Sequence, residues 1–532
     1  MLRKLRFYYL LILALLKKEW KKVSLSVLLL LLAVFIFFAF APFLQSRIAQ
    51  TTNKLIKPLY SEAVVGKPNT FNPLFSKTES EKEINSLVFR GLMKVSSQGV
   101  LESDLAKSFR VKSSTEYEFT LKQDVKWHDG KRFTASDVVY TVKIAQNPLY
   151  ESELSSNFRD VEVNKVDDYT VVFRLKEPFA PFLTATTVGI IPSHIPLNKY
   201  RPVGTGEFRF INVKESEVTL EGAKNKLKFK FYPSFEAALT ALKLGEVHGL
   251  ANFPSQNNGL ANWDNFEIEE KVLPFRLVTA FFNLRDEIFA DKLVRQAFSY
   301  AVPKEELLKI GKGSKGRVAL NSFSLLDTLQ KEAKEKYLFN LEKTNSNLDV
   351  AGWVLAGDGK RYKEGKKLAF SITTVEDSEF EHTALKLKEA WEKVGAEVAV
   401  NIVAGQELKN QIVPNRSFSV LLTSQLLNPD PDQYVLWHTT QTTEANVSGI
   451  TSPKLDKLLE DGRKNLDEKV RREKYQEFAR LLLDEAPAIF LYYPRYVWVH
   501  SNRITQVDLK NFLEPQDRFA QADSWVINRP IW

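Results

Sequence analysis

Hydrophobic residues recur along the chain with two spacings, and the change between them predicts alternating strands and helices. Tyr117, Phe119 and Leu121 are separated by single polar residues, which predicts a half-buried strand. In segment 383–395 the apolar residues recur every three or four positions, as on one helix face, and a strand-like alternation follows at 398–402. This order of elements favours an α/β protein.

Several helix ends are marked by capping residues. Thr134 and Asp137 stand three positions apart at the start of a helical pattern, where they fit the N-cap and N3 positions of a capping box. Gly130 lies in the tight turn just before them. Ser234 fits the N-cap of a later helix, and Gly245 follows its end. Each of these residues has a structural role, and none of them alone indicates a reaction.

One stretch departs from this pattern. Residues 23–44 include no charged residue over 22 positions, and at about 1.5 Å per residue such a helix crosses a hydrocarbon core of about 30 Å. Seven lysines and arginines precede it, which predicts a cytoplasmic amino terminus and an extracytoplasmic body. We therefore expect a basic cytoplasmic and interfacial segment at 1–22, a single transmembrane anchor at 23–44 and a tether at 45–59.

The alternative for this stretch is a cleaved signal peptide. Ala39, Phe40 and Ala41 have the small-x-small pattern of a cleavage site. The apolar run, however, exceeds the ~7–15 residues of such a peptide, and Pro42 is a poor first residue for a mature chain. The length favours a retained anchor in the cell membrane, and cleavage stays open.

The charge of the chain is uneven. The net charge is +9, but residues 1–47 hold eight basic residues against one acidic residue, which leaves 66 basic and 64 acidic residues elsewhere. A nearly neutral body argues against nucleic acid as a partner. With 532 residues the chain exceeds the roughly 250–300 residues of a single core, so more than one lobe is expected.

The sequence holds no catalytic or metal-binding motif. The absence of cysteine excludes disulfides and thiolate nucleophiles, and no two of the six histidines have metal-ligand spacing. Residues 311–316 match G-x-G-x-x-G, but a helical pattern precedes them and a strand-like one follows, the reverse of a dinucleotide site. We therefore expect no enzyme activity, no cofactor and no metal.

An ordered series of short motifs is more specific than any single residue. Segment 91–142 contains VKWHDG followed by FTASDVVYT, segment 202–210 reads PVGTGEFRF, and segment 281–308 contains VRQAFSYAV. AGW at 351–353 and EAPAIFLYY at 485–493 follow. In this order, the motifs resemble the family 5 solute-binding proteins, which capture oligopeptides, dipeptides and related solutes for ABC importers.

The resemblance implies a fold and a domain division. It implies an α/β, two-lobed fold of the periplasmic-binding-protein kind (type II, with an extra small domain). The apolar segment 23–44 adds one transmembrane helix before this fold. The expected parts are a lobe I, a small domain II and a lobe III. Lobe I comprises residues 60–86, 203–272 and 497–532. Small domain II comprises residues 87–202, and lobe III comprises residues 273–496.

The resemblance also implies a function and partners. The protein would capture peptides or a related small solute on the extracytoplasmic side and deliver them to an ABC permease and its ATPase, acting as a monomer. The alternative is a surface sensor or interaction protein with the same fold that transports nothing. An extracytoplasmic hydrolase is disfavoured, because the sequence has no nucleophile motif.

The same resemblance indicates candidate ligand-binding residues. In the family, an aspartate before an Asp-Pro pair holds the α-amine of the peptide, and here Gln425 or Leu427 stands in its place, unless Asp430 or Asp432 replaces it. A neutral amide cannot offset the desolvation of an ammonium as a carboxylate can, which favours blocked or internal peptide segments or another polar solute. The predicted ligand-binding residues are Asn69, Thr70, Phe282, Asn283, Gln425, Asn428, Asp430 and Trp437.

Overall fold

The computed structural model describes residues 5–10, 17, 57–253, 263–310, 313–314 and 316–528. The chain divides into two compact units, residues 1–58 and 59–532. In the first unit, residues 5–10 are helical and exposed. The expected transmembrane segment 23–44 lies outside the described residues, as does nearly all of the tether. Among the residues that are described, no helix combines the length and the apolar character needed to cross a bilayer.

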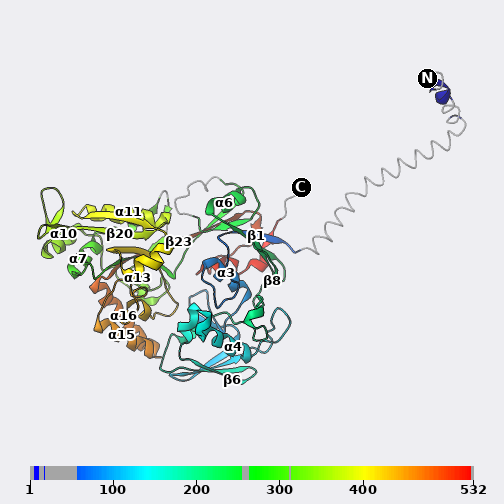
Figure 1. Ribbon diagram of the computed structural model, residues 1–532, viewed down its shortest axis with the longest axis horizontal. Coiled ribbons are helices and arrows are strands. Elements are labelled where there is room, and N and C mark those ends of the chain that lie inside the picture. Colours follow the sequence, from blue (N-terminus) through cyan, green and yellow to red (C-terminus); the bar gives the residue numbers. More distant parts are fainter. Residues whose placement is uncertain are drawn as a thin grey trace. The chain divides into compact units, whose positions relative to one another are not determined.

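The second unit is built around one twelve-stranded sheet (Figure 1). Ten of its strands form one continuous path, and the other two, β12 (Phe266–Val272) and β16 (Gly316–Val318), pair with β23 beside this path. The main path runs, in spatial order, through β21 (Glu397–Val403), β20 (Ala369–Val375), β22 (Val420–Leu426), β13 (Arg276–Phe282), β23 (Ala488–Ser501), β11 (Gly249–Ala251), β1 (Leu59–Val65), β10 (Lys226–Tyr232), β9 (Glu217–Glu221) and β8 (Arg209–Val213).

Strand β23 belongs to both halves of this sheet. Its first residues pair with β13, from Ala488 to Tyr492, and its last residues pair with β11, from Trp498 to His500. We call β1 and β8 to β11 the first half-sheet, and β13, β20, β21 and β22 the second half-sheet. Both halves contain parallel pairs, β1 with β10 and β20 with β21, which confirms the α/β class predicted from the sequence.

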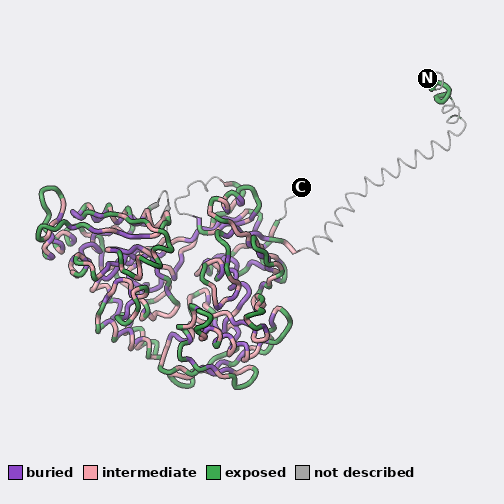
Figure 2. The backbone as a smooth tube through the Cα atoms, in the orientation of Figure 1, coloured by how far each residue is buried: buried purple, intermediate pink, exposed green. Residues whose placement is uncertain are grey.

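Helices cover both faces of the second half-sheet. On one face, Trp391 of α11 (Ser378–Glu392) packs with Phe298 of α7 (Lys292–Tyr300), and α10 (Leu341–Val350) contributes Leu348 to the same core. The opposite face packs against α15 (Pro453–Lys464) and α16 (Glu468–Glu485). Figure 2 shows the buried strands between these exposed outer helix surfaces.

A separate four-stranded sheet, the small sheet, lies between the first two segments of the large one in the sequence. It has the order β4 (Ala106–Ser113), β5 (Glu116–Leu121), β7 (Thr170–Arg174) and β6 (Glu162–Asp167), and α4 (Ala135–Gln146) packs against it. Tyr117, Phe119 and Leu121 are buried, as their alternation predicts, and Thr134 and Asp137 form the predicted capping box.

The glycines of the PVGTGEFRF segment serve close packing. A Cβ atom on Gly204 would lie 1.9 Å from the carbonyl oxygen of Val88, at the end of α3 (Glu79–Val88). The amide of Gly206 donates to that same oxygen at 2.8 Å. Gly204 also accepts a hydrogen bond from the amide of His128, 2.9 Å away. The segment is therefore a closely packed connection, in which glycine is required where a Cβ atom would collide with the backbone of α3.

One helix boundary differs from the prediction. The apolar spacing predicts a helix over 383–395, whereas α11 begins at Ser378 and ends at Glu392. The earlier start follows from Asp377, whose carboxylate accepts hydrogen bonds from the amides of Glu379 and Phe380. The start of α11 is set by this polar cap, which lies outside the apolar face of the helix. The spacing of apolar residues therefore does not predict where the helix begins.

A buried ionic cluster joins the last part of the second unit to its first strand and helix. Arg518, in η6 (Pro515–Phe519), lies 2.8 Å from Glu83 of α3 and 3.2 Å from Glu62 of β1, and all three side chains are buried. Burial raises the pKa of both carboxyl groups, although Arg518 acts in the opposite direction. Arg518 therefore compensates two acids that have no access to water.

Substituting Arg518→Met should lower the free energy of unfolding by about 3–5 kcal/mol, because it leaves two uncompensated buried carboxylates. Urea denaturation followed by circular dichroism measures the change. The matched control is Arg209→Met, which removes an ion pair between Arg209 and Glu221 on a half-exposed strand and should cost less than about 1 kcal/mol. Equal effects of the two substitutions would contradict the role of the buried cluster.

Candidate functional site

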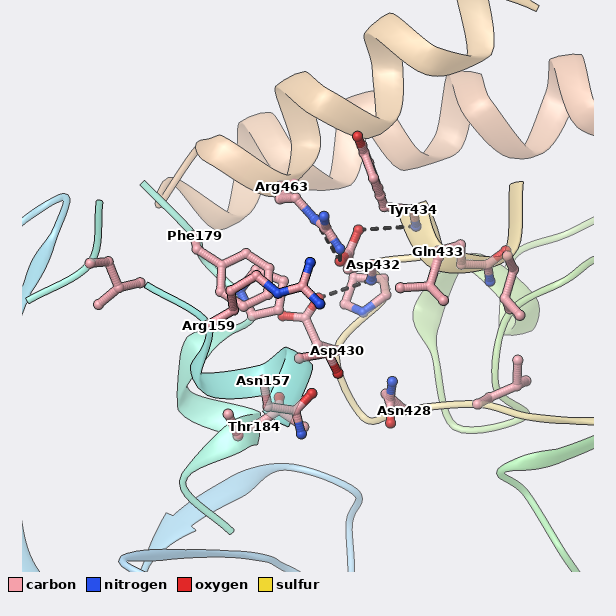
Figure 3. A pocket seen from close by; sticks show the side chains of 18 of the residues that line it. Asn157, Arg159, Phe179, Thr184, Asn428, Asp430, Asp432, Gln433, Tyr434 and Arg463 are labelled. Atoms are coloured by element: carbon pink, nitrogen blue, oxygen red, sulfur yellow. Dashed lines mark hydrogen bonds and ion pairs between the residues drawn. The ribbon is translucent and has the colours of Figure 1, made fainter. Parts of the chain in front are cut away.

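A cavity of about 800 Å³ lies between the small sheet and the second half-sheet. One wall comes from residues 156–161, which begin in η2 (Glu153–Phe158), and from residues 175–187, which end around α5 (Phe182–Ala185). The other wall comes from residues 426–436 after β22, together with Phe323, Asp327 and Arg463. Figure 3 shows side chains from both walls directed into the same space.

Several contacts join the two walls, and we call this set of contacts the clasp. The amide of Ala180 donates to the carbonyl oxygen of Arg463 at 2.9 Å, at the end of α15. The ring of Phe179 lies 5.0 Å from the Arg463 guanidinium, and Lys464 lies 3.2 Å from Glu177. The clasp therefore holds the walls together through a few contacts at the rim of the cavity.

Arg463 is also held from within its own wall. Its guanidinium lies 3.9 Å from the ring centre of Tyr434, and that ring stacks on His438 at 4.0 Å. It donates two hydrogen bonds to Asp432, at 2.7 and 3.0 Å. Burial raises the pKa of Asp432, and the neighbouring Arg463 opposes this rise. The Tyr434 ring and the two hydrogen bonds to Asp432 therefore hold the Arg463 guanidinium in place beside Phe179.

The second acid of this loop is likewise paired. Asp430 accepts two hydrogen bonds from Arg471 of α16, at 2.7 and 3.0 Å. Arg471 donates in addition to the carbonyl oxygen of Gly462 at 2.9 Å. Arg471 binds both oxygens of Asp430, whereas Arg463 binds only Oδ2 of Asp432, whose Oδ1 accepts from the amide of Tyr434 at 3.2 Å. Each of these two carboxylates is therefore already compensated by an arginine.

The cavity brings together two of the predicted ligand-binding residues. Asn428 and Asp430 line it, on the same loop after β22. Asn69 and Thr70 lie in the loop before α3, where their backbone amides donate to Glu81 at 2.6 and 3.3 Å. These two residues are not part of the cavity lining, and their contact with a ligand stays a prediction.

The other four predicted residues have buried side chains that do not line the cavity. Phe282 stacks on Phe289 with ring centres 4.8 Å apart, and Asn283 donates to the carbonyl oxygen of Phe418 at 2.9 Å. Trp437 donates to Gln433 at 3.1 Å, and Gln425 accepts from the Thr279 hydroxyl at 3.1 Å. Core packing and internal hydrogen bonds account for Phe282, Asn283 and Trp437, whereas the amide nitrogen of Gln425 is buried and has no hydrogen-bond partner among the described residues. The ligand role of all four stays a prediction.

Most of the lining residues were missed from the sequence, among them Arg159, Phe179, Asp327 and Arg463. Phe179 follows a proline-rich break, and Asp327 precedes a four-residue helix, α9 (Thr328–Lys331). No local pattern marks such positions, because each becomes a wall residue only through its distant partner across the cavity. A residue-by-residue alignment with a solved structure is the signal that could have found them.

The comparison with protein families agrees with this architecture. Residues 100–446 match the family described as bacterial extracellular solute-binding proteins, family 5 Middle. The chain belongs to this family. It is a solute-binding protein and not an enzyme, with the α/β fold of periplasmic binding proteins.

Individual relatives cover most of the chain. The oligopeptide-binding protein AppA of Bacillus subtilis is 28% identical over 463 residues, 81% of this chain and 85% of that protein. Its structure in complex with a nonapeptide has a TM-score of 0.72 at 25% identity, covering 89% of this chain and all of AppA. NikZ of Campylobacter jejuni, in complex with Ni(L-His), has a TM-score of 0.75 at 25% identity over 88% of this chain and all of NikZ.

Substituting Phe179→Ala should loosen the clasp and raise the exchange rate of the Ala180 amide by about twofold to thirtyfold, the equivalent of a cation–π contact of about 0.5–2 kcal/mol. Hydrogen exchange measured by mass spectrometry reports this rate. The control Glu177→Gln removes only an exposed ion pair and should change the rate little. Unchanged exchange in Phe179→Ala would show that the clasp does not hold the walls.

Proposed function

We propose that this protein is the peptide-binding component of an ABC importer. It captures peptides in the cavity between the small sheet and the second half-sheet and delivers them to a permease driven by a cytoplasmic ATPase. Membership of the solute-binding family supports the general role. The peptide assignment is supported by the likeness to AppA, whose structure holds a nonapeptide.

The observation that carries this proposal is the composition of the cavity walls. Amide and hydroxyl side chains face the cavity from both sides, beside apolar surface from Phe179, Leu427 and Tyr434. A peptide that leaves water needs partners for its backbone amide and carbonyl groups together with apolar contacts for its side chains. The polar wall residues are Asn157, Thr184, Thr187, Asn428, Gln433 and Gln441.

A free metal ion fits these walls less well. Within the described residues, no group of three or more histidine, aspartate or glutamate side chains is arranged to hold a metal. No histidine is among the lining residues of the cavity. Asp430 and Asp432, the most central acids, are already bound by arginines. The walls therefore favour a peptide over an ion.

The proposal also includes the place of the protein in the cell. Residues 23–44 form a single-pass anchor, with the basic segment 1–22 in the cytoplasm and the body outside. The proposed division of the body into lobe I, small domain II and lobe III keeps the boundaries given by the sequence. The small sheet then supplies one wall of the binding site and lobe III the other.

Titration of the full-length protein with short peptides should give saturable heat and a smaller radius of gyration in solution scattering, because the walls close on the ligand. Asn428→Ala should weaken binding by about twofold to tenfold, the loss of one hydrogen bond of about 0.5–1.5 kcal/mol. Arg209→Ala, on an edge strand outside the cavity, is the control and should bind as the wild type does. The absence of any peptide binding would contradict the proposed function.

The full-length protein should stay with membranes after washing with high salt and alkaline carbonate. The double substitution Leu30→Arg and Phe35→Arg places two charges in the middle of the anchor, each costing about 2.5–3.5 kcal/mol of insertion free energy. It should release the protein into the soluble fraction. Amino-terminal sequencing of the native protein that begins at Pro42 would instead establish cleavage.

A further inference from the structure

The acids that line the cavity differ in whether a cation compensates them. Five carboxylates are part of the walls, and three of them form ion pairs: Glu177 with Lys464, Asp430 with Arg471 and Asp432 with Arg463. In the described part of the chain, neither Asp160 nor Asp327 has an ion pair with a lysine or arginine. Asp160 is exposed, so water solvates it, whereas Asp327 is partly buried. Asp327 is therefore the acid that lacks compensation.

The position of Asp327 is fixed by its backbone and by one oxygen. Its Oδ1 accepts a hydrogen bond from the amide of Leu329 at 2.7 Å, at the start of α9. Its own amide donates to the carbonyl oxygen of Ser324 at 3.0 Å. Because one hydrogen bond leaves most of the carboxylate's acceptor capacity unused, the group can still receive a donor from the cavity.

The protein groups around Asp327 disfavour its negative charge. Burial raises its pKa, and the nearby Asp430 raises it further, while Lys331 and Arg472 lower it without forming an ion pair. A cationic ligand group would reverse this balance. The charged or titratable groups around Asp327 are Lys331 on its own helix, Arg472 on α16, Asp430 after β22, Tyr493 on β23, and Arg159, Asp160 and Lys176 on the opposite wall.

A second group in the cavity also lacks a protein partner. The hydroxyl oxygen of Thr184, on α5 of the opposite wall, is buried and forms no hydrogen bond within the described residues. A buried hydroxyl without a partner costs free energy, so a ligand that supplies one is stabilised there. Each wall thus contributes a polar group with unused hydrogen-bonding capacity.

We propose that Asp327 binds an ammonium group of the ligand, the free amino terminus of a peptide. This assignment rests on the proposed function and names the ligand class of the same cavity. The loop after β22 offers only paired acids, and Gln425 and Leu427 carry no charge, so Asp327 supplies the acidic group from a different segment. A lysine side chain of the ligand presents the same chemistry, and the experiment separates the two.

The test is calorimetric titration of the full-length protein and two variants with three versions of one short peptide: free, N-acetylated without lysine, and N-acetylated with one lysine. Asp327→Asn should weaken binding of the free peptide by about 10–100-fold, because a charged hydrogen bond of about 1.5–3 kcal/mol is lost. Asparagine retains the N-cap, so the fold is preserved. The matched control Asp508→Asn changes an exposed carboxylate outside the cavity that also accepts a hydrogen bond from the amide two residues further on, and it should change affinity by less than about twofold.

The pH dependence gives a second measurement. Wild-type affinity for the free peptide should be complete above the raised pKa of Asp327 and should fall as the pH drops through it, because the protonated acid no longer attracts an ammonium. Asp327→Asn should lose this dependence. The N-acetylated peptide without lysine should bind both proteins weakly and with little change over the same pH range.

The outcomes separate the two proposals. Equal binding of free and acetylated peptides, or no effect of Asp327→Asn, overturns the Asp327 assignment and leaves the peptide-binding function standing. Rescue of the acetylated peptide by its lysine overturns the amino-terminal assignment in favour of a side-chain ammonium. Failure of all three peptides to bind the wild-type protein contradicts the proposed function, and the Asp327 assignment falls with it.

Discussion

The sharing of β23 between two half-sheets is the constraint on which the rest of the structure depends. Its two ends are buried in different surroundings, whereas Pro494 and Arg495 in its middle are less buried. Proline has no backbone donor, so the ladder lacks a hydrogen bond at this point. Bending the strand there disturbs fewer interactions than bending it elsewhere. A rotation of the two half-sheets about this point, which the proposed closure on a ligand requires, would therefore break few hydrogen bonds.

The contacts of the clasp are weak enough to allow such a rotation. Each half-sheet has its own buried core, so opening the cavity exposes no large apolar surface inside either half. The clasp adds one backbone hydrogen bond, one cation–π contact and one exposed ion pair, which together amount to only a few kcal/mol. A ligand that touches both walls adds contacts found only in the closed form, which shifts the equilibrium toward it.

The sequence was informative where a residue's role depends on its near neighbours. The alternation of Tyr117 to Leu121 and the pairing of Thr134 with Asp137 are local, and both are confirmed. The cavity is different, because Phe179 and Arg463 lie far apart in the sequence and meet only in the folded structure. Composition could not separate Trp437 in the core from an aromatic wall residue, since both roles favour tryptophan.

The two arginine pairs of the loop after β22 explain how a polar cavity keeps its shape without cargo. Asp430 and Asp432 are tied to α16 and α15, and each helix is fixed by its own apolar contacts with the second half-sheet. A loop held in this way needs little further ordering when a ligand enters, so less binding free energy is lost to conformational entropy. The same pairs leave these acids unable to select the charge of a ligand. The residues that hold the shape of the site are thus different from those that select the charge of the ligand. Such a site can change its preferred ligand without losing the loop that forms it.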